Sequence, residues 1–319
     1  LGLEAITCHS ITNDWSIHGG DLEDMDFSIV SGPFGGVTEG PAWDGKLLLF
    51  THIDSSRILA YDPIKRVTSV YLEDTNFCNG TMFNKDGRYF GCEGGSRTVV
   101  EYTGKSTRVI SANFNGQAYN IPNDLAIDTQ GAIWFTDPFY EGSGGEWSKD
   151  RTQMELDHES VYKIPKNKDS FSDSIRVTFD TTRPNGLLFN LDHSVLYVAQ
   201  SGRNLDEKRQ LRAYPVREDG LLGEPEVLHD FGKWRGIDGM VLDVDGNIWA
   251  TAGTAEGGPG PSIYVFSPNG EIQHRYHLSV DRPTNCTFAG PNLDTLYVTS
   301  IGGHLLMAQT STKGRIWYP

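Results

Sequence analysis

The chain has 319 residues, 38% hydrophobic and 22% charged, a composition that predicts a folded rather than a disordered protein. Its formal net charge of −15 argues against nucleic acid as a partner, because a phosphate backbone is bound by clustered Lys and Arg. No stretch approaches the roughly 18 consecutive apolar residues of a membrane helix, so we expect a soluble protein with no membrane partner. The chain begins at Leu1, and the sequence leaves the compartment open between the cytoplasm and export with a leader removed.

Four cysteines are spread widely along the chain. Cys8, Cys78, Cys92 and Cys286 form no Cys-x-x-Cys pair. This spacing argues against a structural zinc site, whose ligands come in closely spaced pairs. The sequence does not decide whether one or two disulfides form, although a chain of this size does not need them to fold.

A short pattern recurs six times along the chain. Each copy has a tight polar turn followed by alternating β-forming residues with an aromatic side chain, which indicates a hairpin. In chain order the copies are WDGKLLLFTH (43–52), NKDGRYFGC (84–92), DTQGAIWFTD (128–137), LDHSVLYVAQ (191–200), DVDGNIWATA (243–252) and NLDTLYVTS (292–300). Five further segments predict an additional strand after each of the first five copies: RILAYDP, RTVVEYT, SVYKIPK, LRAYPVR and SIYVFSP.

A carboxylate or carboxamide precedes the aromatic residue of every copy by 11 or 12 positions. The successive steps between these polar residues are 40, 44, 62, 53 and 47 residues, the length of one four-stranded propeller blade. We therefore predict an all-β, six-bladed β-propeller that forms a single domain over 1–319, with residues 1–30 packed on the propeller or closing it. A β-helix and a β-sandwich are the alternative folds. The six polar residues are Glu39, Asn79, Asn123, Asn185, Asp238 and Asn285.

These six side chains are expected to converge on the propeller axis, because the innermost strand of each blade runs along the central channel. The two acids, Glu39 and Asp238, would repel each other there unless a cation lay between them. Oxygen ligands suit Ca²⁺, which we expect first, with Mg²⁺, Mn²⁺ and Zn²⁺ left open. Any single Asn or Asp before a strand can instead belong to a local Asx turn. Asn79 and Asn285 also begin N-glycosylation patterns, but a glycan would not fit in a channel.

Several of the repeated segments together resemble a known family. TEGPAWDGKLLLF, FNKDGRYFGCEGGSRTV, YNIPNDLAIDTQGAIWFTDP, RPNGLLFNLDHSVLYVA and GIDGMVLDVDGNIWATA are similar to the SMP-30/gluconolactonase/LRE-like region family over most of residues 35–300. The members are six-bladed propeller lactonases that hydrolyse sugar lactones or related cyclic esters. The resemblance therefore implies a metal-dependent hydrolase with a small lactone or ester as its partner, acting as a monomer or a weak homo-oligomer.

The same resemblance assigns residues to the site. It implies one divalent ion held by Glu39, Asn185 and Asp238, with Asn123 as a further ligand or a contact to water and substrate. The ion would polarise the lactone carbonyl. Asp238 and Asn123 would be catalytic, with Asp238 as general base; activation of the water by the metal itself is the alternative. A serine hydrolase of the α/β type is not indicated, since no Gly-x-Ser-x-Gly segment is present.

Substrate contacts are expected from Asn79, Asn120 and Asp137, although Asp137 can instead cap the turn at Pro138. The polar segment 141–160 is expected to shape the entrance. Two positions depart from the family pattern. Ala118 stands where many gluconolactonase relatives have an Arg associated with substrate, which puts a sugar-lactone preference in doubt. His52 stands within Thr51-His52-Ile53 where Ser-Asp-Ile is usual, and a hydrogen-bonded structural role is the favoured interpretation.

Three functions follow from these observations. The first is the metal-dependent lactonase, with a hydrolase of other esters or organophosphates as a variant. The second is a non-hydrolytic propeller, either similar to strictosidine synthase or one that only binds a small molecule. The third is a scaffold that binds proteins on its faces, which would have no need of a buried acid pair. Retention of both Glu39 and Asp238 favours the first.

Overall fold

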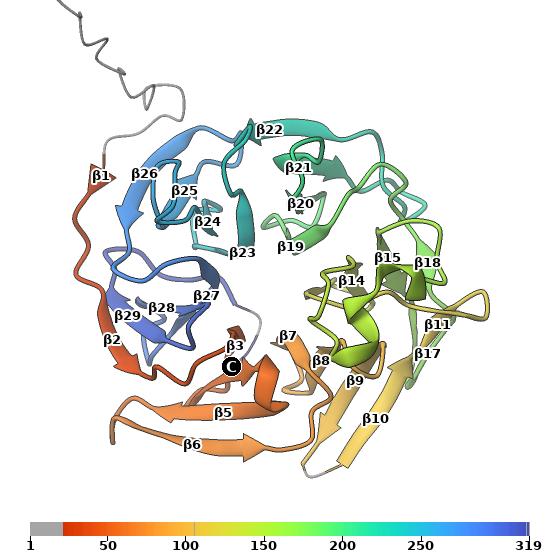
Figure 1. The fold of residues 1–319 in the computed structure, drawn as a ribbon, viewed down its shortest axis with the longest axis horizontal. Helices are drawn as coiled ribbons and strands as arrows, with labels where there is room; N and C mark the ends of the chain where they lie inside the picture. The colour runs from red at the N-terminus through yellow and green to blue at the C-terminus, as the bar shows by residue number, and fades with distance from the viewer. Residues whose placement is uncertain (1–21, 105, 317, 319) are drawn as a thin grey trace, which may run out of the picture.

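The computed structural model describes residues 22–104, 106–316 and 318. Six sheets are arranged as blades around one central axis, each with four antiparallel strands, and one of them carries a fifth, parallel strand (Figure 1). The all-β, six-bladed propeller predicted from the repeats is therefore confirmed. The described residues include no helix long and apolar enough to cross a membrane.

The first three blades follow one another along the chain. Blade 1 contains β3 (Thr38–Trp43), β4 (Leu48–His52), β5 (Arg57–Asp62) and β6 (Val67–Leu72). Blade 2 contains β7 (Cys78–Phe83), β8 (Tyr89–Glu93), β9 (Thr98–Thr103) and β10 (Ser106–Ser111). Blade 3 contains β13 (Leu125–Ile127), β14 (Ile133–Asp137), β15 (Ser160–Ile164) and β18 (Ile175–Arg176).

Blades 4 and 5 continue this order, and blade 6 joins the two ends of the described chain. Blade 4 contains β19 (Pro184–Phe189), β20 (Val195–Ser201), β21 (Arg209–Pro215) and β22 (Glu226–Asp230). Blade 5 contains β23 (Ile237–Leu242), β24 (Ile248–Ala252), β25 (Ser262–Phe266) and β26 (Ile272–His277). Blade 6 contains β27 (Pro283–Ala289), β28 (Thr295–Ser300) and β29 (Leu305–Gln309), and its outermost strand is β2 (Ser28–Ser31).

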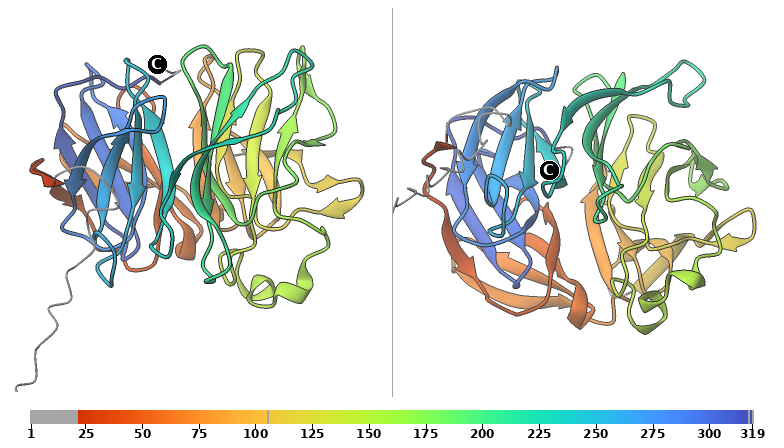
Figure 2. Two further views of the ribbon diagram at one scale, coloured as in Figure 1. Left: turned by 90° about the horizontal axis from the view of Figure 1, so that it is seen from above. Right: turned by 45° about the horizontal axis from the view of Figure 1, so that its top comes forward.

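Short elements decorate this ring. β1 (Leu22–Glu23) pairs in parallel with β26, and two small hairpins are formed by β11 (Asn113–Phe114) with β12 (Gln117–Ala118) and by β16 (Lys166–Asn167) with β17 (Ser170–Phe171). Three 3₁₀ turns are η2 (Ile53–Ser55), η3 (Glu146–Lys149) and η4 (Arg151–Gln153). η3 and η4 project from one face of the ring (Figure 2, left).

The N-terminal segment expected to pack on or close the propeller is described only in part, since residues 1–21 lie outside the described residues. Within the described part, β2 pairs antiparallel with β29. Met25 and Phe27 pack against the hydrophobic cluster between blades 5 and 6. A chain segment before blade 1 thus supplies the last strand of blade 6.

The acid of each repeated turn explains why these segments form hairpins. Asp128 accepts hydrogen bonds at Oδ1 from the backbone N–H of Gln130 (2.9 Å) and Ala132 (3.0 Å), and at Oδ2 from Trp134 Nε1 (2.9 Å). Asp243 holds the corresponding turn of blade 5 and accepts from Trp249 Nε1 at 3.0 Å. One carboxylate therefore fixes both the turn and the following tryptophan.

The hydrophobic core is divided among the six interfaces between neighbouring blades. One cluster of buried residues lies at each interface, and the aromatic residues of the repeats belong to these clusters. Trp134, Tyr197 and Trp249 are almost fully buried. Their rings therefore pack between the blades and are not exposed for stacking on a ligand.

The inner strands approach one another closely at the axis. A Cβ added at Gly186 would lie 2.4 Å from the carbonyl oxygen of Asp238, and one added at Gly239 would lie 2.1 Å from Cγ of Asn285. Only glycine fits at these two positions. The segments RPNG and IDG therefore bring a polar residue and a glycine to the axis together.

Phe27 lies just before β2 and offers a test of how much the segment before blade 1 stabilises the ring. Phe27→Ala should lower the free energy of unfolding by about 1–2 kcal/mol, since a half-buried aromatic side chain loses part of its apolar burial. Phe179→Ala is the matched control, because Phe179 is 72% exposed. Chemical denaturation measures both variants, and equal stabilities would show that the segment does not hold the ring.

Candidate active site

Five of the six polar residues predicted to converge do line one cavity, which has a volume of about 680 Å³. They occupy equivalent places in the chain. Each is the second residue of an inner strand, except in blade 3, where it precedes β13 by two residues. Because the blades surround one axis, residues at equivalent positions of the repeats lie close together in space. The five are Glu39, Asn79, Asn123, Asn185 and Asp238.

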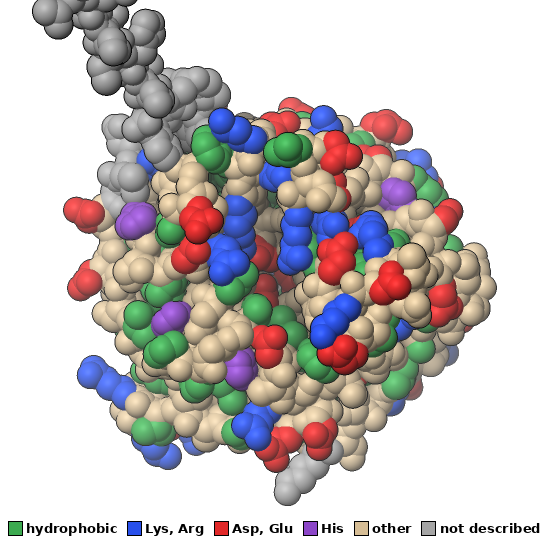
Figure 3. All heavy atoms as spheres, in the orientation of Figure 1, with side chains coloured by type: hydrophobic (Ala, Val, Ile, Leu, Met, Phe, Trp, Pro, Cys, Tyr) green, Lys and Arg blue, Asp and Glu red, His purple; other side chains and the backbone are tan. Residues whose placement is uncertain are grey.

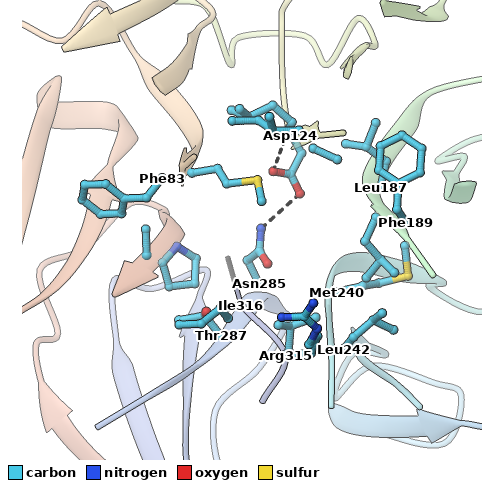
Figure 4. Close-up of a pocket in the computed structure, with 18 of the residues that line it drawn as sticks. Phe83, Asp124, Leu187, Phe189, Met240, Leu242, Asn285, Thr287, Arg315 and Ile316 are labelled. Atoms are coloured by element: carbon cyan, nitrogen blue, oxygen red, sulfur yellow. Dashed lines mark hydrogen bonds between the residues drawn. The ribbon is translucent and has the colours of Figure 1, made fainter. Parts of the chain in front are cut away.

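The sixth residue, Asn285, does not line this cavity, and the expectation of a six-membered ring is wrong there. Asn285 is the third residue of β27, and Thr284 is the second and lines the cavity instead. Successive side chains of a strand point in opposite directions. Asn285 lies in a second, smaller cavity of about 150 Å³ farther along the axis, where its Nδ2 donates to Asp124 Oδ2 at 3.4 Å (Figure 4).

Glu39 is the most deeply buried acid of the cavity, with 4% of the residue exposed. Its Oε2 accepts hydrogen bonds from the backbone N–H of Gly40 (2.8 Å) and from Asn285 Nδ2 (3.1 Å). Burial raises the pKa of Glu39 well above its usual range, and the nearby charges of Asp238 and Asp124 raise it further. The negative charge of this carboxylate is therefore costly unless a cation compensates it.

Asp238 has a cationic partner. Its Oδ2 accepts a hydrogen bond from Arg235 Nη2 at 2.6 Å, and 17% of its side chain is exposed. Burial raises the pKa of Asp238, while the charges of Arg235 and Arg203 oppose that rise. Arg235 also donates to the carbonyl oxygens of Gly253 (3.0 Å) and Pro283 (3.0 Å), which fix its guanidinium in place.

Asp124 is a third axial carboxylate that the sequence analysis missed. It directly follows Asn123 and, by strand alternation, faces the smaller cavity while Asn123 faces the larger one. Burial raises its pKa to about 7, and the charge of Asp238 contributes to the rise. The signal was present in the segment PND, where an acid adjoins a predicted cavity residue.

The amide side chains of the cavity are available for a ligand. Within the described part of the chain, those of Asn79 and Asn123 make no hydrogen bond. Asn185 uses only its Nδ2, which donates to Tyr140 Oη at 3.2 Å. Two carboxylates and three amide oxygens thus form an oxygen donor set that suits a hard divalent cation. Among the described residues, no group of three or more His, Cys, Asp or Glu could hold a metal, so a site here depends on the amides.

Two residues expected to contact substrate lie elsewhere. Asn120 and Asp137 are both 0% exposed, and neither lines the cavity. They are hydrogen-bonded to each other inside blade 3: the N–H of Asn120 donates to Asp137 Oδ2 at 2.8 Å, and Asn120 Nδ2 donates to the carbonyl of Asp137 at 3.1 Å. The segment NIPND runs antiparallel beside the end of β14, since the N–H groups of Ile121 and Asn123 donate to the carbonyls of Pro138 (3.0 Å) and Thr136 (2.9 Å). Of its two Asn residues, only Asn123 lines the cavity.

The two positions that depart from the family pattern also lie outside the cavity lining. Ala118 belongs to β12, and its carbonyl accepts from Arg97 Nη2 at 3.4 Å. His52 bonds through Nε2 to the carbonyl of Gly35 (2.8 Å) and through Nδ1 to Ser55 Oγ (2.7 Å), as expected of a structural histidine.

The segment 141–160 begins at the cavity. Glu141, Gly142 and Ser143 line it, and the chain then forms η3 and η4. Asn79 and Asn285, which begin the glycosylation patterns, are buried. Cys78, Cys92 and Cys286 are free and buried, while Cys8 lies outside the described residues.

Cations gather around the mouth of the cavity, another feature that the sequence analysis missed. Figure 3 shows Lys and Arg side chains around the central hollow. They come from loops of blades 4, 5 and 6 that share no sequence repeat, so no periodic signal marks them. The cavity-lining cations are Arg203, Arg209, Lys233, Arg235 and Arg282.

The raised pKa of Asp124 makes a pH-dependent stability prediction. The folded pKa is about 7 against 3.8 for an unperturbed Asp, so the folded state holds the proton more tightly. This contribution to stability is complete below about pH 4 and is lost as the pH rises to about 7. In EDTA, Asp124→Asn should therefore reduce the fall in unfolding free energy between pH 4 and pH 8 by roughly 2–4 kcal/mol.

Chemical denaturation at both pH values measures this difference. Asp206→Asn, a change at an exposed acid, is the control and should leave the pH dependence as it is in the unchanged protein. An identical pH dependence in Asp124→Asn and the unchanged protein would contradict the raised pKa.

Comparison with known proteins shows the family to which this chain belongs. The family model described as SMP-30/Gluconolactonase/LRE-like region matches residues 37–302. A gluconolactonase of Zymomonas mobilis is 28% identical over 303 residues, covering 87% of this chain and 79% of that protein. A pentonolactonase of Haloferax volcanii is 26% identical over 276 residues, covering 83% and 81%. The structure of a gluconolactonase from Xanthomonas campestris has a TM-score of 0.77 to this chain at 27% identity, covering 90% of each chain. The resemblance read from the sequence motifs is confirmed, and the chain belongs to the SMP-30/gluconolactonase/LRE-like region family.

Proposed function

We propose that this protein is a metal-dependent hydrolase that opens a lactone. The observation that carries the proposal is the convergence of two acids and three amides at one cavity of about 680 Å³, where Asn185 uses only its Nδ2 and the other two amides make no side-chain hydrogen bond among the described residues. The similarity to a gluconolactonase and a pentonolactonase supports the reaction class. A scaffold propeller would have no use for Glu39, whose burial among acids opposes its ionisation.

The proposed ligands of the metal are Glu39, Asn123, Asn185 and Asp238, and Ca²⁺ is the ion that their oxygen atoms suit best. When bound, such an ion would polarise the lactone carbonyl as a Lewis acid and stabilise negative charge on its oxygen. Two hydrogen bonds position these ligands. Tyr140 Oη accepts from Asn185 Nδ2 at 3.2 Å, so Asn185 Oδ1 is not used in that bond. Arg235 Nη2 donates to one oxygen of Asp238 at 2.6 Å and holds it in place.

Asp238 is the proposed general base. Its carboxylate takes a proton from the attacking water while the water oxygen forms a bond to the carbonyl carbon. The ester C–O bond of the ring then breaks, and the ring oxygen leaves as a hydroxyl group after receiving that proton from Asp238. One water is consumed and a hydroxy acid is released. The charge of Arg235 limits the rise in the pKa of Asp238, which favours the ionised form that a general base needs.

Asn79 and Asn123 are proposed to orient the lactone. Their side-chain amides line the cavity and have no hydrogen-bond partner among the described residues. Each can donate from Nδ2 to a ring or hydroxyl oxygen and accept at Oδ1. Asn120 and Asp137, which lie buried behind the wall of blade 3, would act only by holding this part of the chain.

Activity provides the direct test. Acid release from a panel of sugar and aliphatic lactones should disappear in EDTA, return with one of Ca²⁺, Mg²⁺, Mn²⁺ or Zn²⁺, and fall by roughly 10²–10⁴-fold in Asp238→Asn. Asp245→Asn, at an exposed turn of the same blade, is the matched control and should retain full activity. Absence of turnover with metal bound would favour the non-hydrolytic propeller.

Stability tests the metal without any substrate. Ca²⁺ at about 100 times its dissociation constant should stabilise the chelated protein by about 2.7 kcal/mol. This gain should be largely lost in Glu39→Gln, because the buried charge that the ion compensates is gone, and kept in the exposed Glu271→Gln. Thermal unfolding with and without Ca²⁺ measures both. An equal gain in Glu39→Gln would exclude Glu39 as a ligand.

A further inference from the structure

The mouth of the cavity carries positive charge although the protein as a whole is acidic. The chain has 27 Lys and Arg against 42 Asp and Glu. Five of these cations nevertheless line the one cavity that contains Glu39 and Asp238. Figure 3 shows Lys and Arg side chains on the face where the central hollow opens. A concentration of cations at a substrate entrance acts on charged ligands, since clefts lined by one sign of charge focus the field.

Three of the five cations are committed to partners within the protein. Arg209 is buried and donates to backbone carbonyls, among them Gly232 (3.2 Å) and Asn204 (2.8 Å). Arg282 forms an ion pair with its neighbour Asp281 at 3.3 Å. The third, Arg235, holds Asp238. These side chains have structural or catalytic tasks.

The other two cations form no side-chain ion pair among the described residues, although the charge of Arg203 acts on Asp238. The guanidinium of Arg203 lies 4.5 Å from the ring centroid of Tyr140, and the ammonium of Lys233 lies 4.6 Å from that of Trp234. Both residues are exposed at the cavity. A cation on an aromatic face is held in position while its hydrogen-bond donors remain free.

The acids that line the cavity form no ion pair with Arg203 or Lys233. Glu141 is bound to Arg183 at 3.0 Å and lies 3.6 Å from Arg151. Asp54, on blade 1, accepts from the backbone N–H of Val37 at 2.7 Å. The two cations in the loops of blades 4 and 5 are therefore able to pair with a negative group of a ligand.

The platform under Arg203 connects it to the proposed metal ligands. Tyr140, on which Arg203 is stacked, accepts through Oη from Asn185. Lys233 precedes Arg235, the partner of Asp238, by two residues. Both free cations thus border the reacting end of the cavity on the same side.

We propose that the lactone opened by this protein carries an anionic substituent, a carboxylate, sulfonate or phosphate, which Arg203 and Lys233 bind. This inference rests on the proposed lactone hydrolysis and names its substrate class. Ala118, where the family pattern has its Arg, lies away from the cavity lining, so the cations that meet the substrate come from blades 4 and 5 instead. The negative group lies toward these blades while the ester lies against Asp238.

Binding can be measured apart from turnover with cyclic analogues that cannot hydrolyse. We expect 1,5-anhydroglucitol 6-phosphate to bind at least tenfold more tightly than 1,5-anhydroglucitol, as measured by calorimetry. Arg203→Gln and Lys233→Gln should each reduce this preference about tenfold. Arg217→Gln, at an exposed Arg paired with Asp219, is the matched control. Equal binding of the two analogues, or an undiminished preference in the double variant, would overturn the proposal.

Turnover separates the substrate class from the reaction. The ratio of kcat/KM for 6-phosphoglucono-1,5-lactone to kcat/KM for glucono-1,5-lactone should exceed ten. This ratio should fall in both Arg203→Gln and Lys233→Gln. The same measurement with a lactone that carries a carboxylate at C6 distinguishes a preference for phosphate from one for carboxylate. Turnover of the neutral lactone with no gain from the charge would overturn the anionic substrate and leave the hydrolase. Charge-dependent binding with turnover of neither lactone would overturn the hydrolase and leave anion recognition.

Discussion

The close approach of six inner strands at one axis is the constraint on which the rest of this structure depends. It places Glu39, Asp238 and Asp124 near one another in a region from which most water is removed. Burial raises the pKa of each, and the charge of Asp238 adds to the rise for Glu39 and Asp124. A fold could avoid this cost with apolar residues at the axis, so the retained acids point to a function that uses their charge.

The ring can hold these charges because its stability is distributed. Each of the six blade interfaces has its own buried cluster, and turn acids such as Asp128 and Asp243 hold the hairpins locally. The axis is then free to carry polar groups. Threonine hydroxyls at the inner strands illustrate this, since Thr284 Oγ1 donates to the carbonyl of Thr38 at 2.7 Å and so joins blades 6 and 1.

The sequence predicted the fold and most of the site because both follow from periodicity. A turn, an aromatic residue and a polar residue at constant offset sufficed to place Glu39, Asn79, Asn123, Asn185 and Asp238 in one cavity. The prediction erred in blade 6, where Asn285 and Thr284 differ by one position. A shift of one residue reverses the direction of a side chain in a strand, and an offset of 11 or 12 residues does not resolve it.

Other features had no periodic signal at all. In the sequence, Asp124 stood out only as the neighbour of Asn123. Its place in the smaller cavity could not be predicted without the register of the strand that follows. Asn120 and Asp137 belong to the motif segments but form a fully buried hydrogen-bonded pair, and the sequence alone does not show which Asn of NIPND lines the cavity. The cations of the mouth lie in loops whose lengths differ between blades, and such loops come together only in the folded ring.

This division between axis and loops bears on how substrate is chosen. The axial acids and amides are fixed by the packing of the blades, so they suit the part of the reaction that all lactones share. The loops carry Arg203 and Lys233, which can change without disturbing any blade interface, since both are exposed. A fold does not determine a substrate. In this propeller the charge that could select one lies at the rim, opposite in sign to the acids beneath it, and a ligand reaching both must present its negative group to the loops of blades 4 and 5 and its electrophilic carbon to Asp238.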